Sequence, residues 1–504
     1  MNNYQAWLET PNIVRIALVQ VSPIAGGILT TRYLATHAVT VDGIEYLPVV
    51  RDDITIDESI SLEYAASISY GDISIANNSG AYDSWLLDIW VNKSVKIYVG
   101  SLPAPTTAST ITDFELVFDG LIADIDSKNR NIISLKLRDK LEKLNTSISE
   151  ALLGNYYQGS VLPGDSTLYQ NQYKNSLKPL CFGEVHNITP MLIDPTTLEY
   201  MVNLEAVERL IEVRDNGVPV EFTTNTSPAG CFKLAKSPAG TITCSVQGIK
   251  RTVNINSAST SSTYSDTASN TIATILKHFG QKLEYSELES SSFSSLGTES
   301  VGIYITDRAN VLATCQSLAK SCGLILTVTR AGKVKLVNLT IPITASKTIT
   351  ESDMFLNSLV ISNKPTVLAG IKLGYAKNWT IQNNLLTAIP QQHKDLYAIE
   401  YLESIQYDNA VKQNYSSTVE PELEGTYLID KAESDSVALK RLNLRKEQRK
   451  IFSMRCTAKW LSLQVGEAVT IQAYRFGLNT GALGIVTSTK PNWLRGYIEI
   501  EVLV

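Results

Sequence analysis

Residues 71–90, GDISIANNSGAYDSWLLDIW, restrict the possible fold more than any other stretch of the chain. The stretch begins with alternating Ile73, Ser74 and Ile75, which is the pattern of a half-buried strand. It continues through Asn-Asn-Ser-Gly, residues that accept the backbone angles of a tight turn. Five residues then follow at helical spacing, namely Tyr82, Trp85, Leu86, Ile89 and Trp90. We therefore expect a helix of about three turns, whose aromatic face packs on a sheet and forms the structural core there.

The segments around this stretch have the pattern of β-strands. Residues 39–46 predict a hairpin, because Asp42-Gly43 accepts the positive φ of a two-residue turn. Residues 54–75, 95–99 and 114–137 alternate apolar and polar side chains. Together these segments predict a compact β-barrel or sandwich of about 140 residues with one embedded helix.

This first region resembles the first barrel of tail hub and tail-tip structural proteins from tailed bacteriophages and gene transfer agents. The resemblance depends on the order of three phrases: DGIEYLPV, GDISIANNSGAYDSWLLDIW and FELVFDGLIADI…ISLKLRDKLEKL. A second resemblance lies in DRANVLATCQSLAKSCGLILTVTRAGKVKLV, which is similar to the helical module of phage hubs and of type VI secretion spike hubs. Apolar periodicity predicts helices over about residues 269–280 and 306–323 in that region. A third, LSLQVGEAVTI, resembles the second tube-like barrel of hubs, with Glu467 where that family pattern has Asp.

The length of 504 residues is too great for one hydrophobic core and indicates several domains. We expect a first tube-like β-barrel over 1–145, a linker and β domain over 146–255, and an α+β hub domain over 256–345. A second tube-like β-barrel, with a helix over 430–450, is expected over 346–504. The predicted fold class is mainly β with a few helices (α+β), with two tail-tube-like β-barrels plus inserted β and α+β domains.

Composition argues against two classes of protein. A net charge of −6 does not suit a nucleic-acid-binding surface spread over the whole molecule. There is no run of eighteen apolar residues and no basic-then-apolar start, so we expect no membrane anchor and synthesis in the cytoplasm. Six scattered cysteines, none at C-x-x-C spacing, predict buried free thiols.

Residue patterns for catalysis or metal binding are weak. The four histidines lack metal-ligand spacing, and we expect no metal and no cofactor. Residues 164–168 spell G-D-S-T-L, an esterase-like string, but no histidine has Asp three residues before it. Cys315 and Cys322 lie on one helix face, which predicts a core stripe rather than an iron–sulfur ligand set. We therefore predict that the chain is not an enzyme and assign no catalytic residue.

One basic run is a candidate subunit interface. It contains Lys440, Arg441, Arg445, Lys446 and Arg449, with Lys450 at its end. Three interpretations remain open: a solvated helix face, a contact with an acidic neighbouring subunit, or contact with DNA phosphates. As a hypothesis, acidic partners lie at Asp52, Asp53, Asp57 and Glu58.

The resemblance implies a structural baseplate or tail-tip hub in the virion, assembled in the host cytoplasm. Such a hub is a homotrimer that adapts the sixfold tail tube to a threefold spike or fibre and encloses the channel for viral genome ejection. Its implied partners are the tail tube or distal tail protein, a central spike or fibre protein and the tape measure protein. DNA passes through without sequence-specific binding. The alternatives are a hexameric distal tail protein, a tail-tip carbohydrate-binding adhesin and a peptidoglycan hydrolase.

Overall fold

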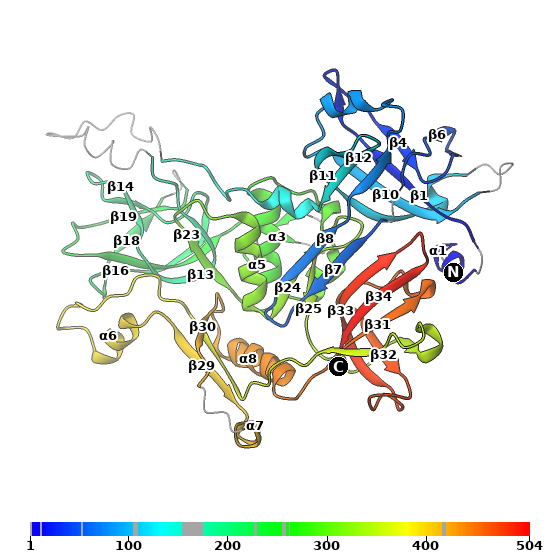
Figure 1. Ribbon diagram of the computed structural model, residues 1–504. Coiled ribbons are helices and arrows are strands. Elements are labelled where there is room, and N and C mark those ends of the chain that lie inside the picture. Colours follow the sequence, from blue (N-terminus) through cyan, green and yellow to red (C-terminus); the bar gives the residue numbers. More distant parts are fainter. Residues whose placement is uncertain are drawn as a thin grey trace. The chain divides into compact units, whose positions relative to one another are not determined.

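The computed structural model divides into two compact units, each assembled from segments that are distant in sequence (Figure 1). Unit 1 contains Met1–Glu142, Ile325–Val367 and Gln448–Val504, and unit 2 contains Lys143–Leu324 and Leu368–Glu447. The structure describes residues 3–10, 13–51, 54–103, 109–153, 175–225, 229–254, 259–261, 263–415 and 420–504. The four predicted domain ranges stay a prediction.

The first sheet of unit 1 is antiparallel, with strand order β4-β1-β10-β11-β12-β9. Residues 47–51 close it into a ring. They bond to β4 through Ala35 N–H to Leu47 O (2.7 Å) and to β9 through Ala76 N–H to Val49 O (2.8 Å). Closure leaves no free sheet edge, so this is a barrel. The bounds are β1 Arg15–Val21, β4 Arg32–Ala35, β9 Ile73–Ala76, β10 Ser94–Ser101, β11 Glu115–Asn129 and β12 Ile132–Arg138.

Two hairpins decorate this barrel. The predicted hairpin over 39–46 is confirmed as β5 (Val39–Val41) and β6 (Ile44–Tyr46), with φ of 49° at Asp42 and 73° at Gly43. A shorter hairpin, β2 (Ile24–Ala25) and β3 (Ile28–Leu29), turns through Gly26-Gly27. The helix α1 (Asn3–Glu9) precedes the first strand.

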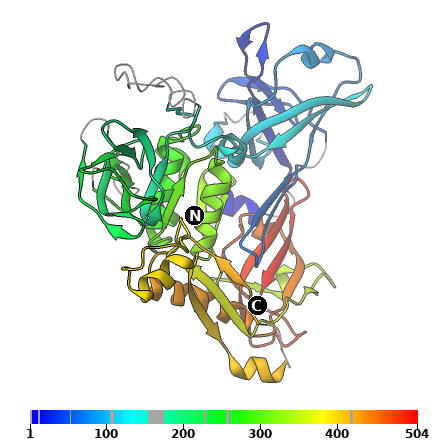
Figure 2. The ribbon, with the colours of Figure 1, turned by 90° about the vertical axis from the view of Figure 1, so that its left-hand side faces the viewer.

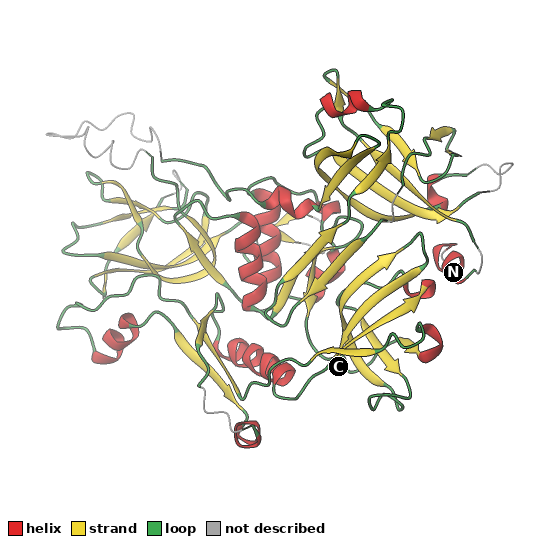
Figure 3. Cartoon of the chain, in the orientation of Figure 1, coloured by secondary structure: helices red, strands yellow, loops and turns green. Residues whose placement is uncertain are grey.

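The second sheet of unit 1 has the order β26-β32-β33-β34-β31-β27. The segment that follows β26 pairs with β31, because Phe355 N–H donates to Arg455 O (2.8 Å). Since β26 itself pairs with β32, this continuous stretch joins the two ends of the sheet and closes a second barrel. The bounds are β26 Lys347–Thr350, β27 Val360–Asn363, β31 Ile451–Thr457, β32 Ala468–Gln472, β33 Ala482–Asn492 and β34 Tyr497–Leu503. The prediction of a mainly β, multidomain chain with a few helices is confirmed; strands dominate Figure 3.

A hairpin from the N-terminal region belongs to this second sheet. β7 (Ile56–Ile60) pairs with β33 and with β8 (Ala66–Tyr70), and blue β7 lies near red β33 in Figure 1. The two barrels also share one hydrophobic cluster of buried side chains. That cluster includes Trp7, Trp90, Phe118, Ile349, Trp460 and Trp493. The barrels therefore form one core rather than two independent ones.

Arg330 joins the parts of unit 1. It lies in the turn between β24 (Leu324–Val328) and β25 (Val334–Asn338) and is 7% exposed. Its guanidinium donates to the backbone oxygens of Leu461 and Leu463, each at 2.8 Å, and its Nε lies 3.4 Å from the buried Glu58 carboxylate. Its own carbonyl accepts the N–H of Asp119 (3.0 Å). Four segments of unit 1 thus meet at one buried ion pair.

Unit 2 contains a five-stranded sheet, β17-β16-β20-β13-β23, and a four-stranded sheet, β14-β15-β19-β18, whose inner faces share a core. Their bounds are β13 Leu180–Ile188, β14 Met191–Asp194, β15 Glu199–Met201, β16 Val207–Asp215, β17 Val218–Pro219, β18 Phe222–Thr224, β19 Cys231–Leu234, β20 Ile242–Ile249 and β23 Gly302–Ile305. A small pair, β21 (Thr252–Asn254) and β22 (Ser259–Ser261), lies beside α3 (Ala268–His278).

The helices of unit 2 follow the predicted periodicity. α3 and α5 (Val311–Ser321) lie side by side (Figure 2), and both helices in this region are confirmed. α5 starts later than expected because Asn310 caps it, accepting the N–H of Ala313 at 3.0 Å. Among the described residues, the other α-helices of unit 2 are α4 Ser290–Ser295, α6 Gln391–Ala398, α7 Asn409–Asn414 and α8 Lys431–Arg445, the last shorter than the predicted 430–450. α8 packs on β28 (Gly370–Tyr375) and β29 (Leu402–Tyr407), with β30 (Leu423–Gly425) at the sheet edge.

Arg330→Met is expected to lower the free energy of unfolding of unit 1 by about 3–5 kcal/mol, because Glu58 would stay buried without its cation. The double variant Arg330→Met/Glu58→Gln is expected to lose clearly less than the single variant. Urea unfolding followed by tryptophan fluorescence measures this, since every tryptophan except Trp379 lies in unit 1. A double variant as unstable as the sum of both single variants would show that the two charges do not interact.

Candidate functional site

The predicted helix over 82–90 is wrong. The structure has a five-residue 3-10 helix, η1 (Asp83–Leu87), instead of three α-turns. The Asn77 side chain organises the turn before it, donating to Asp83 Oδ1 (2.6 Å) and accepting the N–H of Tyr82 (2.9 Å). After Leu87 the chain is extended, and Ile89 pairs with Ile24 as an isolated β-bridge. Pairing with a strand therefore replaces the second helical turn.

A half-buried cation, the Arg32 guanidinium, holds η1 in place. The Arg32 guanidinium lies 4.2 Å from the Trp85 ring centre and 5.0 Å from that of Trp90, and it forms an ion pair with Asp88. Trp90 donates its indole N–H to the Trp85 carbonyl at 2.7 Å. Trp85 is 9% exposed and Trp90 1% exposed. These two of the five predicted core residues are thus fixed by cation–π, ionic and hydrogen-bond contacts.

The other three predicted core residues lie differently. Tyr82 is half-buried, Leu86 is 39% exposed and Ile89 is 56% exposed. A 3-10 helix advances three residues per turn, so Leu86, at the i+4 position of the expected α-helix, no longer shares the inner face. Ile89 lies beyond η1, in the extended segment that pairs with Ile24. The structural-core assignment of Leu86 and Ile89 is therefore corrected: both belong to the surface.

Exposed apolar side chains gather around η1. We call them the apolar corner: Ile28, Leu29, Leu86, Leu87, Ile89 and Val91. The β2–β3 hairpin is joined to the η1 segment by two hydrogen bonds of 3.0 Å between the backbones of Ile24 and Ile89. Six exposed aliphatic side chains thus lie on two segments that backbone hydrogen bonds join.

The predicted basic interface is largely paired inside unit 2. Arg441 is 3% exposed, binds Glu424 at 2.9 Å and donates to the Lys320 carbonyl at the end of α5. It is therefore an internal residue, on the same buried face of α8 as Val437, Ala438 and Leu444, which sequence reasoning missed because it grouped Arg441 with the basic residues around it. Lys440 pairs with Glu299 (3.7 Å).

Lys446 and Arg445 have partners within unit 2, whereas Arg449 belongs to the part of the chain assigned to unit 1. Lys446 pairs with Asp408 at 3.6 Å, and the Arg445 carbonyl accepts the N–H of Leu368. Arg449 follows the end of α8. A subunit contact through Lys440, Arg445, Lys446 and Arg449 stays a prediction.

The acidic partners suggested for this run have other contacts. Glu58 faces Arg330, and Asp57 lies 3.9 Å from Lys490. Asp52 and Asp53 lie outside the described residues. Asp57 and Glu58 thus have partners within unit 1, and their proposed pairing with the basic run of a neighbouring subunit stays a prediction.

Groups that could carry redox or metal chemistry are buried or scattered. All six cysteines are buried free thiols, and burial raises the pKa of Cys231 and of Cys456 to about 12. Among the described residues, no three His, Cys, Asp or Glu side chains gather in a way that would hold a metal ion. The esterase-like string at 164–168 lies outside those residues. Within the same ranges, no helix has the length and apolar character needed to cross a bilayer.

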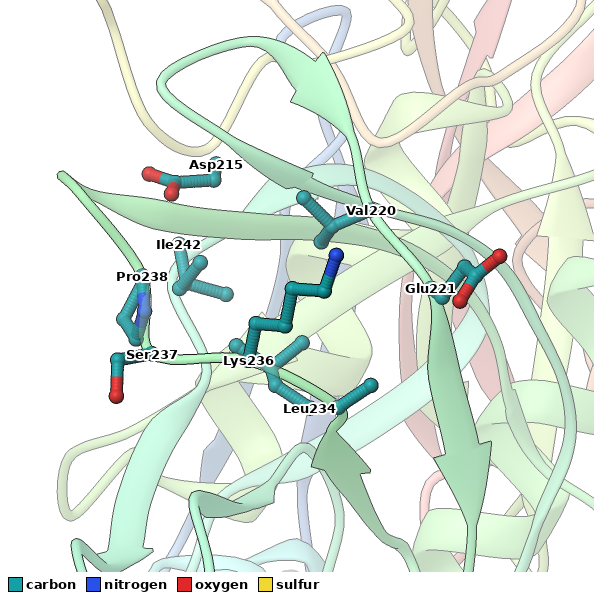
Figure 4. A pocket seen from close by; sticks show the side chains of 9 residues that line it. Asp215, Val220, Glu221, Leu234, Lys236, Ser237, Pro238 and Ile242 are labelled. Atoms are coloured by element: carbon teal, nitrogen blue, oxygen red, sulfur yellow. The ribbon is translucent and has the colours of Figure 1, made fainter.

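One pocket lies at the end of the β16 and β20 strands in unit 2. It has a volume of about 380 Å³, and Figure 4 shows the Lys236 side chain extending across it toward Val220. Asp215, on its wall, accepts the N–H groups of Ala239 (2.6 Å) and Gly240 (2.8 Å), so its carboxylate shapes the wall. We call it the Lys236 pocket.

A second pocket of about 240 Å³, the apolar pocket, is framed by residues after β28 and before β29. Asn378 holds the frame, because its side chain donates to the carbonyls of Tyr397 and Ile399, each at 2.9 Å. Asn187 fixes Asn378 in turn through a 2.9 Å hydrogen bond. The lining side chains are mainly apolar and include Ala376, Leu396, Tyr397, Ile399 and Leu402.

Trp90→Ala is expected to lower the free energy of unfolding by about 3–5 kcal/mol, as truncation of a buried aromatic side chain does. Ile89→Ala, one residue away and exposed, is expected to change it by less than about 0.5 kcal/mol. Urea denaturation of both variants compares the two positions. If both variants lost the same free energy of unfolding, Ile89 would be a core residue and the corrected assignment would be wrong.

Arg441→Met is expected to cost about 1.5–3 kcal/mol, because a buried guanidinium loses hydrogen bonds to a carboxylate and a helix-end carbonyl. The matched control Lys440→Met removes a partly exposed, 3.7 Å ion pair and should cost less than about 1 kcal/mol. Thermal unfolding distinguishes them. If Lys440→Met proves the more damaging change, the internal role of Arg441 is wrong.

No protein-family model matches the chain, and the search of curated proteins finds no match. Solved structures do match it. The tail protein from Neisseria meningitidis MC58 is 11% identical, with a TM-score of 0.37, over 96% of both chains. The 43 kDa tail protein of prophage MuSo2 from Shewanella oneidensis is 10% identical, with a TM-score of 0.40, over 97% of this chain and 98% of that one. The prophage tail protein gp18 from Listeria monocytogenes EGD-e is 7% identical, with a TM-score of 0.37, over 96% and 94%. All three similarities have TM-scores below 0.5.

Proposed function

We propose that the chain is a structural hub at the baseplate or tail tip of a bacteriophage. The observation that carries the proposal is the pair of closed barrels in unit 1, which share one hydrophobic cluster within one polypeptide. The order of the three sequence phrases supports the same assignment. A hub of this kind needs rigid barrels at a fixed spacing, and a shared core supplies that rigidity.

The proposed task is symmetry adaptation. Three copies with two barrels each would present six barrel elements, which match a sixfold tail tube on one side. The same three copies match a threefold spike or fibre on the other side. In this proposal the chain is a homotrimer in the virion, assembled in the host cytoplasm. It contacts the tail tube or distal tail protein, a central spike or fibre protein and the tape measure protein.

The channel of such a trimer would let DNA pass during genome ejection. A net charge of −6 supports a channel that does not retain DNA, because excess negative charge repels phosphate. The proposed role is structural rather than enzymatic, and affinity for neighbours would come from apolar contacts repeated by symmetry. A hexameric distal tail protein remains the alternative ring component.

The Lys236 pocket favours a second candidate, a carbohydrate-binding adhesin at the tail tip. Its wall combines apolar Val220 and Pro238 with Asp215, Glu221 and Lys236. Sugars bind to such mixed surfaces through hydrogen bonds and apolar contact. A glycan array with the purified chain, and with Lys236→Ala as control, distinguishes binding through this pocket from other glycan binding.

Immunogold electron microscopy with an antibody against the purified chain tests the hub assignment. We expect gold at one end of the tail, opposite the capsid, and we expect deletion of the gene to yield particles without a competent tail tip. A capsid antibody serves as the positional control. Gold along the tail shaft, or particles that form complete tails without the chain, would contradict the assignment.

A further inference from the structure

The apolar pocket of unit 2 is bordered by a β-bulge in β13. Two residues of β13, His186 and Asn187, oppose one residue of β20, Ser245, between the paired positions on either side. Asn187 has a φ of 54°, in the left-handed region that few residues other than glycine adopt. Bulges change the direction of side chains relative to the sheet, and both His186 and Asn187 line the pocket. The pocket wall therefore takes two polar side chains from a strand whose other residues contribute to the core.

The side chain of Asn187 is fixed but incompletely paired. Its Nδ2 donates to three oxygens: Asn378 Oδ1 at 2.9 Å, the Thr380 carbonyl at 2.7 Å and Gln382 Oε1 at 3.2 Å. These oxygens fix the orientation of the amide, because Oδ1 in the place of Nδ2 would face acceptors. Oδ1 itself is shielded from solvent and accepts no hydrogen bond from the residues that the structure describes. Such a buried acceptor is costly unless a donor reaches it.

His186 has no hydrogen bond at its ring. Its Nε2 lies 3.6 Å from Glu184 Oε1, which is beyond hydrogen-bond distance, and within the described ranges neither ring nitrogen has another partner. Burial lowers the pKa of His186, so the imidazole is neutral at pH 7 and offers one donor and one acceptor nitrogen. The pocket therefore has a polar end, formed by His186 and Asn187, where both a donor and an acceptor are unpaired.

The rest of the wall is neutral and mainly apolar. Glu400, the acidic residue among those that line the pocket, pairs with Lys377 at 3.3 Å. A charged ligand would lose its hydration without gaining a free counter-ion, so this wall favours a neutral ligand. The pocket opens to solvent beside Leu396 and Ile399, which are 45% and 44% exposed. The remaining lining side chains are those of Ala376, Leu402, Tyr397 and Tyr401, with Asn378 in the frame.

We propose that this pocket binds a neutral phenolic ring, with the phenol hydroxyl hydrogen-bonded at the polar end formed by His186 and Asn187. A hydroxyl is both donor and acceptor, so it can supply the donor that Asn187 Oδ1 lacks and accept from His186. The rings of Tyr397 and Tyr401 in the wall favour an aromatic body over an aliphatic one. Benzene fills a cavity of about 150 Å³, and the larger volume of about 240 Å³ here leaves room for the hydroxyl and one methyl group. This site lies within unit 2 alone, and phenol binding there is independent of the hub assignment.

Two probes of similar shape test the polar end. p-Cresol carries a hydroxyl where toluene carries a hydrogen, and ligand-detected NMR with the purified full chain measures the dissociation constant of each. We expect p-cresol to bind at least about tenfold more tightly, because its hydroxyl meets two unpaired groups. In a pocket that is merely apolar, toluene would bind more tightly, because burial of a hydroxyl without a partner is costly. Equal affinities, tighter binding of toluene or no binding of p-cresol would overturn the proposal.

A third probe, 4-methylcyclohexanol, keeps the hydroxyl and replaces the aromatic ring by an aliphatic one. We expect it to bind more weakly than p-cresol, because it cannot form aromatic contacts with the two tyrosine rings. Binding as tight as that of p-cresol would overturn the assignment of an aromatic ligand.

Removal of the histidine nitrogens tests the same end of the pocket from the protein side. His186→Phe keeps a planar ring in the wall, and we expect it to weaken p-cresol binding at least about fivefold and to change the toluene dissociation constant less than about twofold. His393→Phe is the matched control, because His393 is exposed on α6 and does not line the pocket. No change at His186→Phe, or an equal loss at His393→Phe, would contradict the proposal. Melting temperatures show whether each variant is folded, and the comparison of p-cresol with toluene on the wild type decides if His186→Phe is not.

A free phenol and the tyrosine side chain of a neighbouring protein present the same chemical group. Titration with the blocked tripeptide acetyl-Ala-Tyr-Ala-amide beside p-cresol distinguishes these two sources. A peptide that binds at least as tightly as p-cresol identifies a tyrosine side chain as the occupant, whereas tighter binding of p-cresol identifies a small phenol. Both results uphold the proposal, and binding of neither overturns it.

Discussion

The buried contact between Arg330 and Glu58 is the interaction on which unit 1 depends. Arg330 lies in the β24–β25 turn, and Glu58 lies in β7. The carbonyls that accept hydrogen bonds from Arg330, those of Leu461 and Leu463, belong to the second barrel. Leaving one of these charges buried and unpaired would cost several kcal/mol, so the ion pair stabilises the packing of these segments against one another. Arg330 Nε lies 3.4 Å from the Glu58 carboxylate but forms no hydrogen bond with it. The two hydrogen bonds to backbone carbonyls therefore orient the guanidinium.

This constraint explains why two barrels behave as one body. In the sequence β7 lies among the strands of the first barrel, but it pairs with β33 of the second barrel, next to the ion pair. Around it, a single cluster of buried side chains continues from one barrel to the other. Protein interiors are close-packed and transmit displacement, so the barrels hold a fixed relation within unit 1. A proposed adaptor between symmetries requires this property more than it requires any reactive group.

Local pattern predicted much of the fold. Period-two alternation placed the strands, Asp42-Gly43 placed a hairpin, and apolar spacing placed α3 and α5. The same logic failed over residues 82–90, because aromatic residues at helical spacing suit a 3-10 turn followed by an extended segment equally well. What decided the outcome was a partner distant in sequence: Arg32 holds Asp88, and Ile24 holds Ile89. The burial of Arg330 and Arg441 could not be predicted for the same reason, because a buried charge depends on partners that are distant in sequence.

Copy number in the assembled particle tests the central claim most directly, because the claim is that two barrels in one chain convert threefold into sixfold symmetry. A cryo-electron microscopy reconstruction of the tail tip measures it. The account predicts three copies around the tail axis, with their six barrels on one ring against the tube. Six copies around the axis, or barrels of one chain at different heights along it, would contradict it.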